Sequence, residues 1–284
     1  MMRSVLAFIL AAATACAADG WLTKVTVNGT IDGKAATTGM EVYLPAGYTK
    51  NKTARKYPLV IALHGWNHSP ALWRQKGDLG PFADKYGVVI AVPNMGQTVY
   101  ESTFYPETIS GWRMAPGVRW IGEAVLTHMR KKYSVHTNRA HTAVIGYSTG
   151  GRGAVLVSEL YPEFAFAGSV SGTFDLMRLK TSEGEYKIHE VVYGKRDKFP
   201  ERWQKDNCIS PSLVSNLTGT ALFIGHGGRD TSVRPDQLDA LRDALKGTSI
   251  RAEFIVQTNG IHDWSYWNSQ WDAMFTAMHA AITK

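Results

Sequence analysis

A serine between glycines is the residue of this 284-residue chain whose type and spacing most clearly permit chemistry. The segment GYSTGG, residues 146–151, follows the apolar run HTAVIG and opens a helix-like run. A strand that turns directly into a helix strains the residue between them, and glycine on both sides removes Cβ atoms that would collide. Ser148 then lies at the first helical turn, where the helix dipole and free N–H groups favour negative charge. The pattern predicts a nucleophile; a polar residue in an ordinary tight turn is the alternative.

A serine hydroxyl becomes a nucleophile only when a base takes its proton and an acid orients that base. In open α/β sheets, active-site residues follow the carboxyl ends of strands. Arg229 and then Asp230 follow the apolar run TALFIGHGG, so Asp230 lies in the loop just past a strand end, and His262 follows RAEFIVQ through a short loop. We therefore predict Ser148, Asp230 and His262 as nucleophile, acid and base. Asp175, which follows the run FAGSVSG, remains the alternative acid.

Other acids and histidines fit these roles less well because of where they lie. Asp236 and Asp239 fall in a helical pattern, where a solvated face explains them better. Five other histidines lie where a base is not expected. His128 and His279 fall inside predicted helices, His136 and His141 precede the serine strand, and His189 lies in the segment 173–220.

The segment LVIALHGWNHSP ends an early strand at His64 and Gly65. Backbone N–H groups after such a strand, together with the one that follows the nucleophile, can bind the oxygen of a carbonyl group. Trp66 and Thr149 are therefore the predicted oxyanion donors. No other metal-ligand types accompany His64 and His68, so we interpret them as loop structure and expect no metal.

The elements that would position these residues predict an α/β fold. Residues 21–44 alternate between apolar and polar, which indicates an antiparallel hairpin. The later strands are short, continuous apolar runs, as in a sheet covered on both faces. Alternation with helices predicts a mostly parallel central sheet flanked by helices. The helical segments are 71–85, 118–133, 150–160, 235–246 and 264–283.

The segment 173–220 departs from this alternation. It is rich in aromatic and polar residues and separates two predicted core strands. We interpret it as an excursion over the strand ends that shapes a substrate pocket, and not as a second domain. Residues 19–284 are accordingly expected to form one catalytic domain.

Several motifs together resemble the α/β-hydrolase superfamily, and within it the esterase D-like family that includes feruloyl and acetylxylan esterases and S-formylglutathione hydrolases. These motifs are LHG, FADKYGVVIAVPN, GYSTGG, SVSG, HGGRD and GIHDWSYW, and the resemblance covers most of residues 40–282. It implies a triad of Ser148, Asp230 and His262 and no cofactor. Many relatives carry Met after the nucleophile, whereas this chain has Thr149; the backbone amide is kept but the pocket wall changes.

The N-terminus predicts export. Met-Met-Arg, an apolar stretch from Ser4 to Ala15 and small residues through Ala18 are typical of a signal peptide of residues 1–18. The alternative is cleavage before Cys16 with a lipid anchor on that cysteine. The expected localisation is secreted or periplasmic, or lipoprotein at the surface. Besides Cys16 the chain has only Cys208, so no intramolecular disulfide is expected after cleavage.

Bulk composition excludes several other classes. Hydrophobic residues make up 44% and charged residues 19% of the chain, which is typical of a globular protein and not of a disordered chain or membrane bundle. The net charge of +7 is scattered. We interpret the run Arg130-Lys131-Lys132 as a helix C-terminal preference, so no nucleic-acid partner is expected.

Aromatic residues lie near the predicted site and bear on the substrate. Trp66, Trp112 and Trp203 fall in predicted loops and could form a platform for a sugar or an aromatic acyl group. Trp264 follows His262 and is also a candidate substrate contact, although its helical spacing with Trp267 and Trp271 favours a core position. The sequence thus predicts an exported serine carboxylesterase, with an acyltransferase or a non-catalytic binding protein as alternatives.

Overall fold

The structure is a computed structural model that describes residues 20–51, 53–108 and 115–282. The predicted leader with Cys16, and the candidate substrate residue Trp112, lie outside the described residues.

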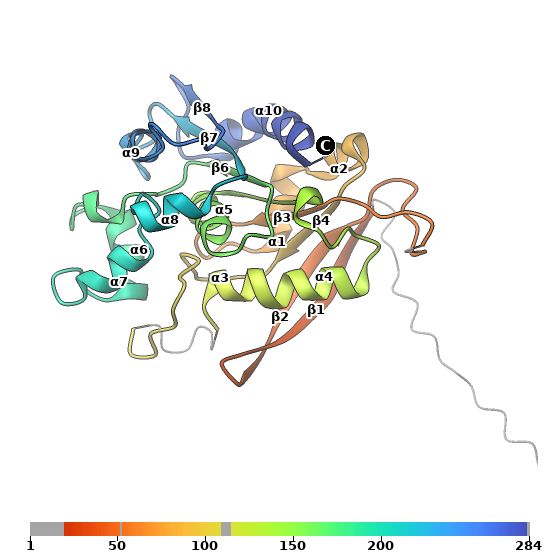
Figure 1. Cartoon of the computed structure of the whole chain (residues 1–284). Coiled ribbons are helices and arrows are strands. Elements are labelled where there is room, and N and C mark those ends of the chain that lie inside the picture. The colour runs from red at the N-terminus through yellow and green to blue at the C-terminus, as the bar shows by residue number, and fades with distance from the viewer. Residues whose placement is uncertain (1–19, 52, 109–114, 283–284) are drawn as a thin grey trace, which may run out of the picture.

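The alternating N-terminal segment forms the expected hairpin of β1 (Trp21–Ile31) and β2 (Lys34–Tyr43), paired antiparallel. Its two-residue turn holds Asp32 at φ 50° and Gly33 at φ 74°, and positive values at both positions suit the twist of a tight hairpin. β2 also pairs antiparallel with β4 and so joins the hairpin to the main sheet, as Figure 1 shows.

The continuous apolar runs form the core of one eight-stranded sheet in the order β1-β2-β4-β3-β5-β6-β7-β8. From β4 to β8 every neighbouring pair is parallel. The predicted fold class, a mostly parallel sheet with an antiparallel hairpin, is confirmed. The parallel strands are β3 (Leu59–Leu63), β4 (Val89–Pro93), β5 (Thr142–Tyr147), β6 (Phe166–Val170), β7 (Ala221–Gly227) and β8 (Ala252–Gln257).

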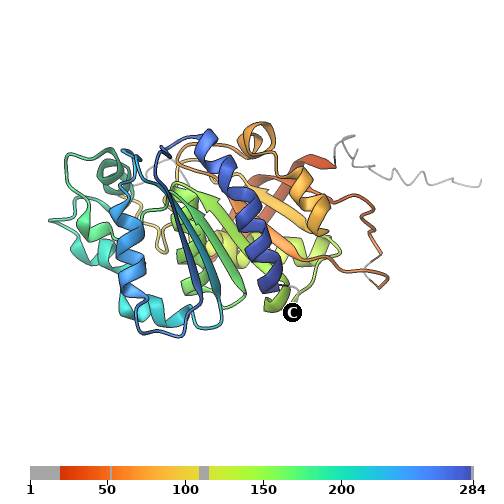
Figure 2. The same cartoon turned by 90° about the horizontal axis from the view of Figure 1, so that it is seen from above.

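Helices cover both faces of the sheet, so the strands from β3 to β7 are buried on both sides. Val144 packs in the cluster on one face, and its neighbours Ala143 and Ile145 pack in the cluster on the other. Figure 2 shows α9 and α10 on opposite sides of the blue strands. One face carries α3 (Gly117–Arg119), α4 (Leu126–Lys132), α5 (Thr149–Leu160), α8 (Pro211–Asn216) and α9 (Asp236–Ala244); the other carries α2 (Gly80–Tyr86) and α10 (Trp264–Ile282).

Two predicted helices differ in detail from the expectation. The segment 71–85 is not one helix but α1 (Pro70–Leu72), a π-helical turn over Trp73–Gly77 and α2. It is interrupted because Asp78 adopts a left-handed conformation, with φ at 42°. The segment 118–133 is continuous, but a π-helical turn over Trp120–Val125 joins α3 to α4. α4 ends at Lys132, as the basic run predicted.

The excursion contains α6 (Gly184–Tyr193), α7 (Pro200–Lys205), α8 and one turn of 3₁₀ helix at Leu176–Arg178; a second such turn, Arg139–His141, precedes β5. α6 and α7 pack into a small apolar cluster separate from the two main ones, whereas α8 packs on the sheet. Trp203 belongs to that cluster, so its predicted position in an exposed loop is wrong. It lies in α7, is 0% exposed, stacks on Tyr186 at 4.9 Å and donates to the Gly194 carbonyl. Its ring fills this cluster and is not a substrate platform.

Candidate active site

The turn between β5 and α5 has the strained form that the glycines predicted. Ser148 has φ 55° and ψ −128°, an unusual conformation for a residue with a side chain. A Cβ on Gly146 would lie 2.2 Å from the Gly150 oxygen, and one on Gly150 would lie 2.2 Å from the Leu63 oxygen. Both glycines are therefore required by close backbone contact, which lets α5 begin directly after the serine.

The structure brings Ser148, His262 and Asp230 together. The Ser148 hydroxyl lies 3.0 Å from Nε2 of His262, and Nδ1 of His262 lies 2.7 Å from Oδ2 of Asp230. Because a carboxylate only accepts, Nδ1 carries the proton and Nε2 is left to accept from Ser148. The three residues come from the turn after β5, the loop after β7 and the loop after β8. This is the geometry in which a neutral imidazole takes a proton from a hydroxyl.

Asp230 is held in its ionised form. Burial would raise its pKa, but the hydrogen bond from His262, the electrostatic interaction with that ring and the hydrogen bond from the Val233 N–H together outweigh burial, and the net pKa lies below the ordinary value. Its other oxygen, Oδ1, accepts from the backbone N–H groups of Ser232 at 3.0 Å and Val233 at 2.9 Å. The carboxylate is therefore fixed in position before it orients His262.

His226 borders Asp230 but is kept neutral. Its Nε2 donates to the Val233 carbonyl at 2.9 Å and lies 3.7 Å from the Asp230 carboxylate. Burial lowers its pKa, so it adds no charge beside the acid near neutral pH. Sequence reasoning did not single out this residue.

The predicted oxyanion donors lie on the two segments that meet at Ser148. Thr149 is the first residue of α5, so its N–H belongs to the turn that has no acceptor within the helix. A Cβ on Gly65 would lie 3.3 Å from Cβ of Ser148, which brings the loop that carries Trp66 against the nucleophile. The role of both amides stays a prediction.

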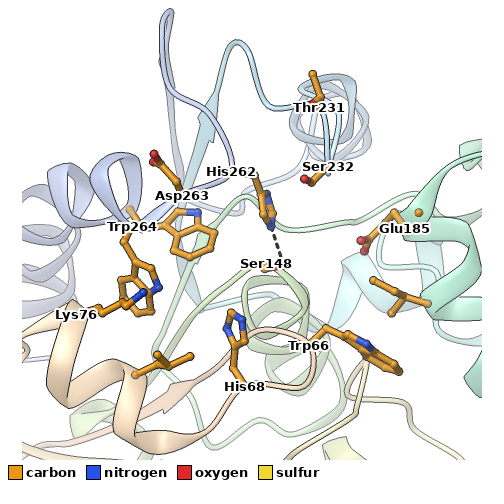
Figure 3. Close-up of a pocket in the computed structure, with 14 residues that line it drawn as sticks. Trp66, His68, Lys76, Ser148, Glu185, Thr231, Ser232, His262, Asp263 and Trp264 are labelled. Atoms are coloured by element: carbon orange, nitrogen blue, oxygen red, sulfur yellow. Dashed lines mark hydrogen bonds between the residues drawn. The ribbon is translucent and has the colours of Figure 1, made fainter.

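A cavity of about 680 Å³ opens above Ser148 (Figure 3). His262 enters it from above, and Trp264 and Lys76 form one side. Glu185 and Trp66 form the opposite side. The remaining lining residues are His68, Leu72, Gly184, Ile188, Thr231, Ser232, Asp263 and Trp267.

The candidate tryptophans occupy different environments. Trp66 and Trp264 line the cavity, and their role as substrate contacts stays a prediction. Trp271 is buried in the core, so the core interpretation is right for this residue. Trp267 is buried but also touches the cavity, and Trp264 lines the cavity, so the core interpretation is incomplete for Trp264.

The alternative acids lie elsewhere. Asp175 caps a short 3₁₀ helix by accepting from Met177 N–H and pairs with Arg178. Asp236 pairs with Arg234, and Asp239 pairs with Arg242. The structure thus brings Asp230, and none of these three, to His262.

The two histidines of the early loop have structural contacts. The Met95 N–H donates to Nε2 of His64, whose Nδ1 donates to the Gly65 carbonyl. His68 lies 3.0 Å from the Tyr147 hydroxyl and lines the cavity. Among the described residues there is no group of three or more His, Cys, Asp or Glu side chains placed to hold a metal.

Several lining residues were missed by sequence reasoning. Thr231 and Ser232 directly follow Asp230, so the strand-end rule could have found them. Lys76 lies in a helix-like segment and Glu185 in the excursion. No sequence pattern distinguishes these last two from solvated charges. In the part of the chain that the structure describes, no helix is long and apolar enough to cross a membrane.

The sheet order and the helices on its two faces define an α/β-hydrolase fold, with a candidate nucleophile at the strained serine turn. The chain belongs to the family described as "Putative esterase", whose sequence profile matches residues 35–282. It is accordingly a carboxylic ester hydrolase.

Relatives with known names differ in what they act on. A diacylglycerol acyltransferase/mycolyltransferase Ag85B of Mycobacterium leprae is 26% identical over an alignment of 254 residues that covers 74% of this chain and 76% of that protein. An endo-1,4-beta-xylanase/feruloyl esterase of Xylanibacter ruminicola is 23% identical over 87% of this chain, but the match spans only 30% of that longer protein.

Solved structures show the same fold. A ferulic acid esterase superposes with a TM-score of 0.67 at 20% identity, covering 91% of this chain and 97% of that one. An S-formylglutathione hydrolase from Agrobacterium tumefaciens gives a TM-score of 0.71 at 17% identity, covering 94% and 97%. Together with the sheet order, these likenesses confirm the α/β-hydrolase fold.

Proposed function

We propose that the protein is an exported serine esterase that forms an acyl-enzyme on Ser148 and cleaves carbohydrate-linked acetyl or feruloyl esters. The observation that carries the mechanism is the hydrogen-bonded chain from Ser148 through His262 to Asp230, at 3.0 and 2.7 Å. A relative that bears the name feruloyl esterase supports the substrate class. Export is supported by the leader-like N-terminus.

The reaction follows from the geometry. His262 accepts the Ser148 proton through Nε2 while Oγ bonds to the ester carbonyl carbon. The N–H groups of Trp66 and Thr149 donate to the oxyanion. The imidazolium then gives its proton to the alkoxy oxygen, the ester C–O bond breaks and the alcohol leaves. Water repeats these steps on the acyl-enzyme and releases the carboxylic acid and free Ser148.

Ser148→Ala tests the mechanism directly. Because the nucleophile is lost and the fold is kept, the variant should show an unchanged circular dichroism spectrum and about a 10⁵- to 10⁶-fold lower rate on p-nitrophenyl acetate. A fluorophosphonate probe should label the wild-type protein at Ser148 and leave the variant unlabelled. Full activity in the variant would refute the mechanism, and absence of labelling in the wild type would revive the non-catalytic alternative.

Acyl transfer is the second candidate, because the Mycobacterium leprae relative is named an acyltransferase. The same acyl-enzyme can react with a sugar or lipid alcohol in place of water. Product analysis with a competing alcohol separates the two: a transferase forms the new ester in excess water, whereas a hydrolase releases mainly the free acid.

Cys16→Ala tests the mode of export. Under simple cleavage after residue 17 or 18, the wild-type protein and the variant both appear in the soluble extracellular or periplasmic fraction. Under lipidation, only the wild type partitions into detergent, and the variant loses that property. Intact mass of the mature N-terminus distinguishes the two, and retention of the whole leader in the cytoplasm would contradict export.

A further inference from the structure

A buried carboxyl group faces the nucleophile across the cavity. Glu185 lies in the first turn of α6, is 6% exposed and lines the pocket that contains Ser148 and His262. In Figure 3 its carboxyl points into the cavity from the side opposite Trp264 and Lys76. The proposed ester cleavage, with Ser148, His262 and Asp230, does not use it.

Contacts from α6 and from the loop after β6 hold Glu185 in this orientation. The Thr173 hydroxyl, in the loop after β6, donates to its Oε1 at 2.6 Å. Nδ1 of the buried His189 donates to its backbone carbonyl at 2.9 Å. Burial lowers the pKa of His189 to about 3, so this ring is neutral and is no ion-pair partner.

The second carboxyl oxygen of Glu185 remains available. Within the described ranges no hydrogen bond reaches Oε2, although the residue is almost wholly withdrawn from solvent. Oε2 is not among the fully buried, unpartnered oxygens of the described residues, so it keeps access to the cavity that Glu185 lines. A ligand that enters the cavity can therefore donate a hydrogen bond to it.

The neighbours of Glu185 narrow the type of donor. Trp66 and Ile188 add apolar surface to the lining of the same cavity, and Thr231 and Ser232 add hydroxyl groups to it. An acceptor next to an aromatic ring and to hydroxyls matches a sugar, which offers C–H faces and hydroxyl donors together.

The cavity lining carries side chains of both charge signs, so it favours neither a cationic nor an anionic substrate throughout. Lys76 on the opposite side disfavours a substrate that carries an ammonium group, and Glu185 itself disfavours one that carries a carboxylate. A neutral, hydroxyl-rich group meets neither repulsion.

We propose that Glu185 is a specificity-determining residue that accepts a hydrogen bond, through Oε2, from a free hydroxyl of a neutral sugar carrying the ester. This inference rests on the proposed esterase function and names the group that the cavity selects. Glu185 binds this hydroxyl and takes no proton in the reaction, so its loss should raise KM and leave kcat nearly unchanged.

Two esters of similar size test the proposal: a methyl β-xyloside monoacetate, which has free hydroxyls, and cyclohexyl acetate, which has none. Glu185→Leu should lower kcat/KM on the xyloside ester by about 10- to 100-fold through KM, and change the cyclohexyl ester less than about twofold. Glu185→Gln keeps an acceptor oxygen and should recover part of the loss. Glu190→Gln, a partly exposed site on the same helix outside this cavity, is the matched control and should leave both rates unchanged.

The outcomes separate the possible explanations. An equal loss on both esters at unchanged thermal stability, or no loss on the xyloside ester, would overturn the role of Glu185. A Glu185-dependent preference for acetylcholine over the xyloside ester would show that the site takes a cation instead and would also overturn it. Failure of the proposed function looks different, because the wild type would then cleave neither ester and fluorophosphonate would not label Ser148.

Discussion

Ser148 is held in a strained backbone conformation because the surrounding backbone bonds it on both sides. Its N–H donates to the Val170 carbonyl at 2.9 Å, and its carbonyl accepts from the Arg152 N–H at 3.1 Å. With its φ of 55° the side chain stands above β5, within reach of His262. The neighbouring strand and the first helical turn thus stabilise the orientation that the proposed chemistry needs.

Asp230→Asn tests the role of the acid. The amide can donate to His262 and favour the wrong tautomer, so kcat on p-nitrophenyl acetate should fall by about 10⁴-fold with little change in fold. Asp175→Asn is the control and should lose no more than about twofold in kcat. The reverse ranking of the two variants would assign the acid to Asp175.

The lowered pKa of Asp230 predicts that the unfolding free energy of the protein depends on pH. Its folded pKa is lowered, so its ionisation stabilises the native state above the ordinary value of 3.8, and that contribution is lost as pH falls through the folded pKa. The difference in unfolding free energy between the wild type and Asp230→Asn should therefore shrink as pH falls below about 4. Urea titrations between pH 3 and 7 measure it; a difference that grows toward low pH would contradict the lowered pKa.

Thr149 offers a prediction about stability alone. Its buried Oγ1 has no hydrogen-bond partner among the described residues. Thr149→Val removes that hydroxyl and keeps the N–H, so the unfolding free energy should rise by about 1 kcal/mol. Thr142→Val is the matched control: its buried hydroxyl donates to the Asn138 carbonyl, and the variant should lose about 1 kcal/mol. Equal effects of both substitutions in urea denaturation would argue against an unsatisfied Oγ1.

At the scale of elements, the sequence predicted the strands and the three residues of the site because each is a local signal. Apolar runs mark buried strands, and Asp230 and His262 lie in the short loops that follow such runs. Glu185 and Trp203 could not be placed in this way. Both lie in the excursion, whose path depends on contacts distant in sequence, such as Thr173 with Glu185 and Tyr186 with Trp203. A tryptophan in a polar stretch therefore appeared exposed although α6 and α7 bury it.

The β5–α5 junction gives a prediction at this scale. Gly150→Ala places a Cβ 2.2 Å from the Leu63 oxygen, and neither backbone can move without shifting β3 or α5. The unfolding free energy should fall by about 3 kcal/mol, and esterase activity should fall with it because Ser148 moves. Gly39→Ala in β2 is the control, since a Cβ there meets nothing within 4 Å, and it should change stability by less than about 1 kcal/mol. Similar denaturation midpoints for both variants would show that the β5–α5 junction does not require glycine at position 150.

At the scale of the whole molecule, one buried cation joins the excursion to the helix that carries the nucleophile. Arg152 in α5 is fully buried and donates to the Val99 carbonyl, the Tyr193 hydroxyl and the Asp206 carbonyl. Tyr193 also donates to the Asp206 carboxylate at 2.8 Å. Because α6 and the end of α7 share these bonds with α5, we expect the excursion and the sheet to unfold together, in keeping with the predicted single domain.

Arg152→Leu tests this coupling. The substitution leaves the buried Asp206 carboxylate without its neighbouring cation, so the unfolding free energy should fall by about 3–5 kcal/mol. Arg242→Leu breaks a surface pair with Asp239 and should cost less than about 1 kcal/mol. Tryptophan fluorescence, to which the buried Trp203 contributes, and far-ultraviolet circular dichroism should report one coincident transition in the wild type. Separate transitions, or equal costs for the two arginine variants, would show that the excursion is an independent unit.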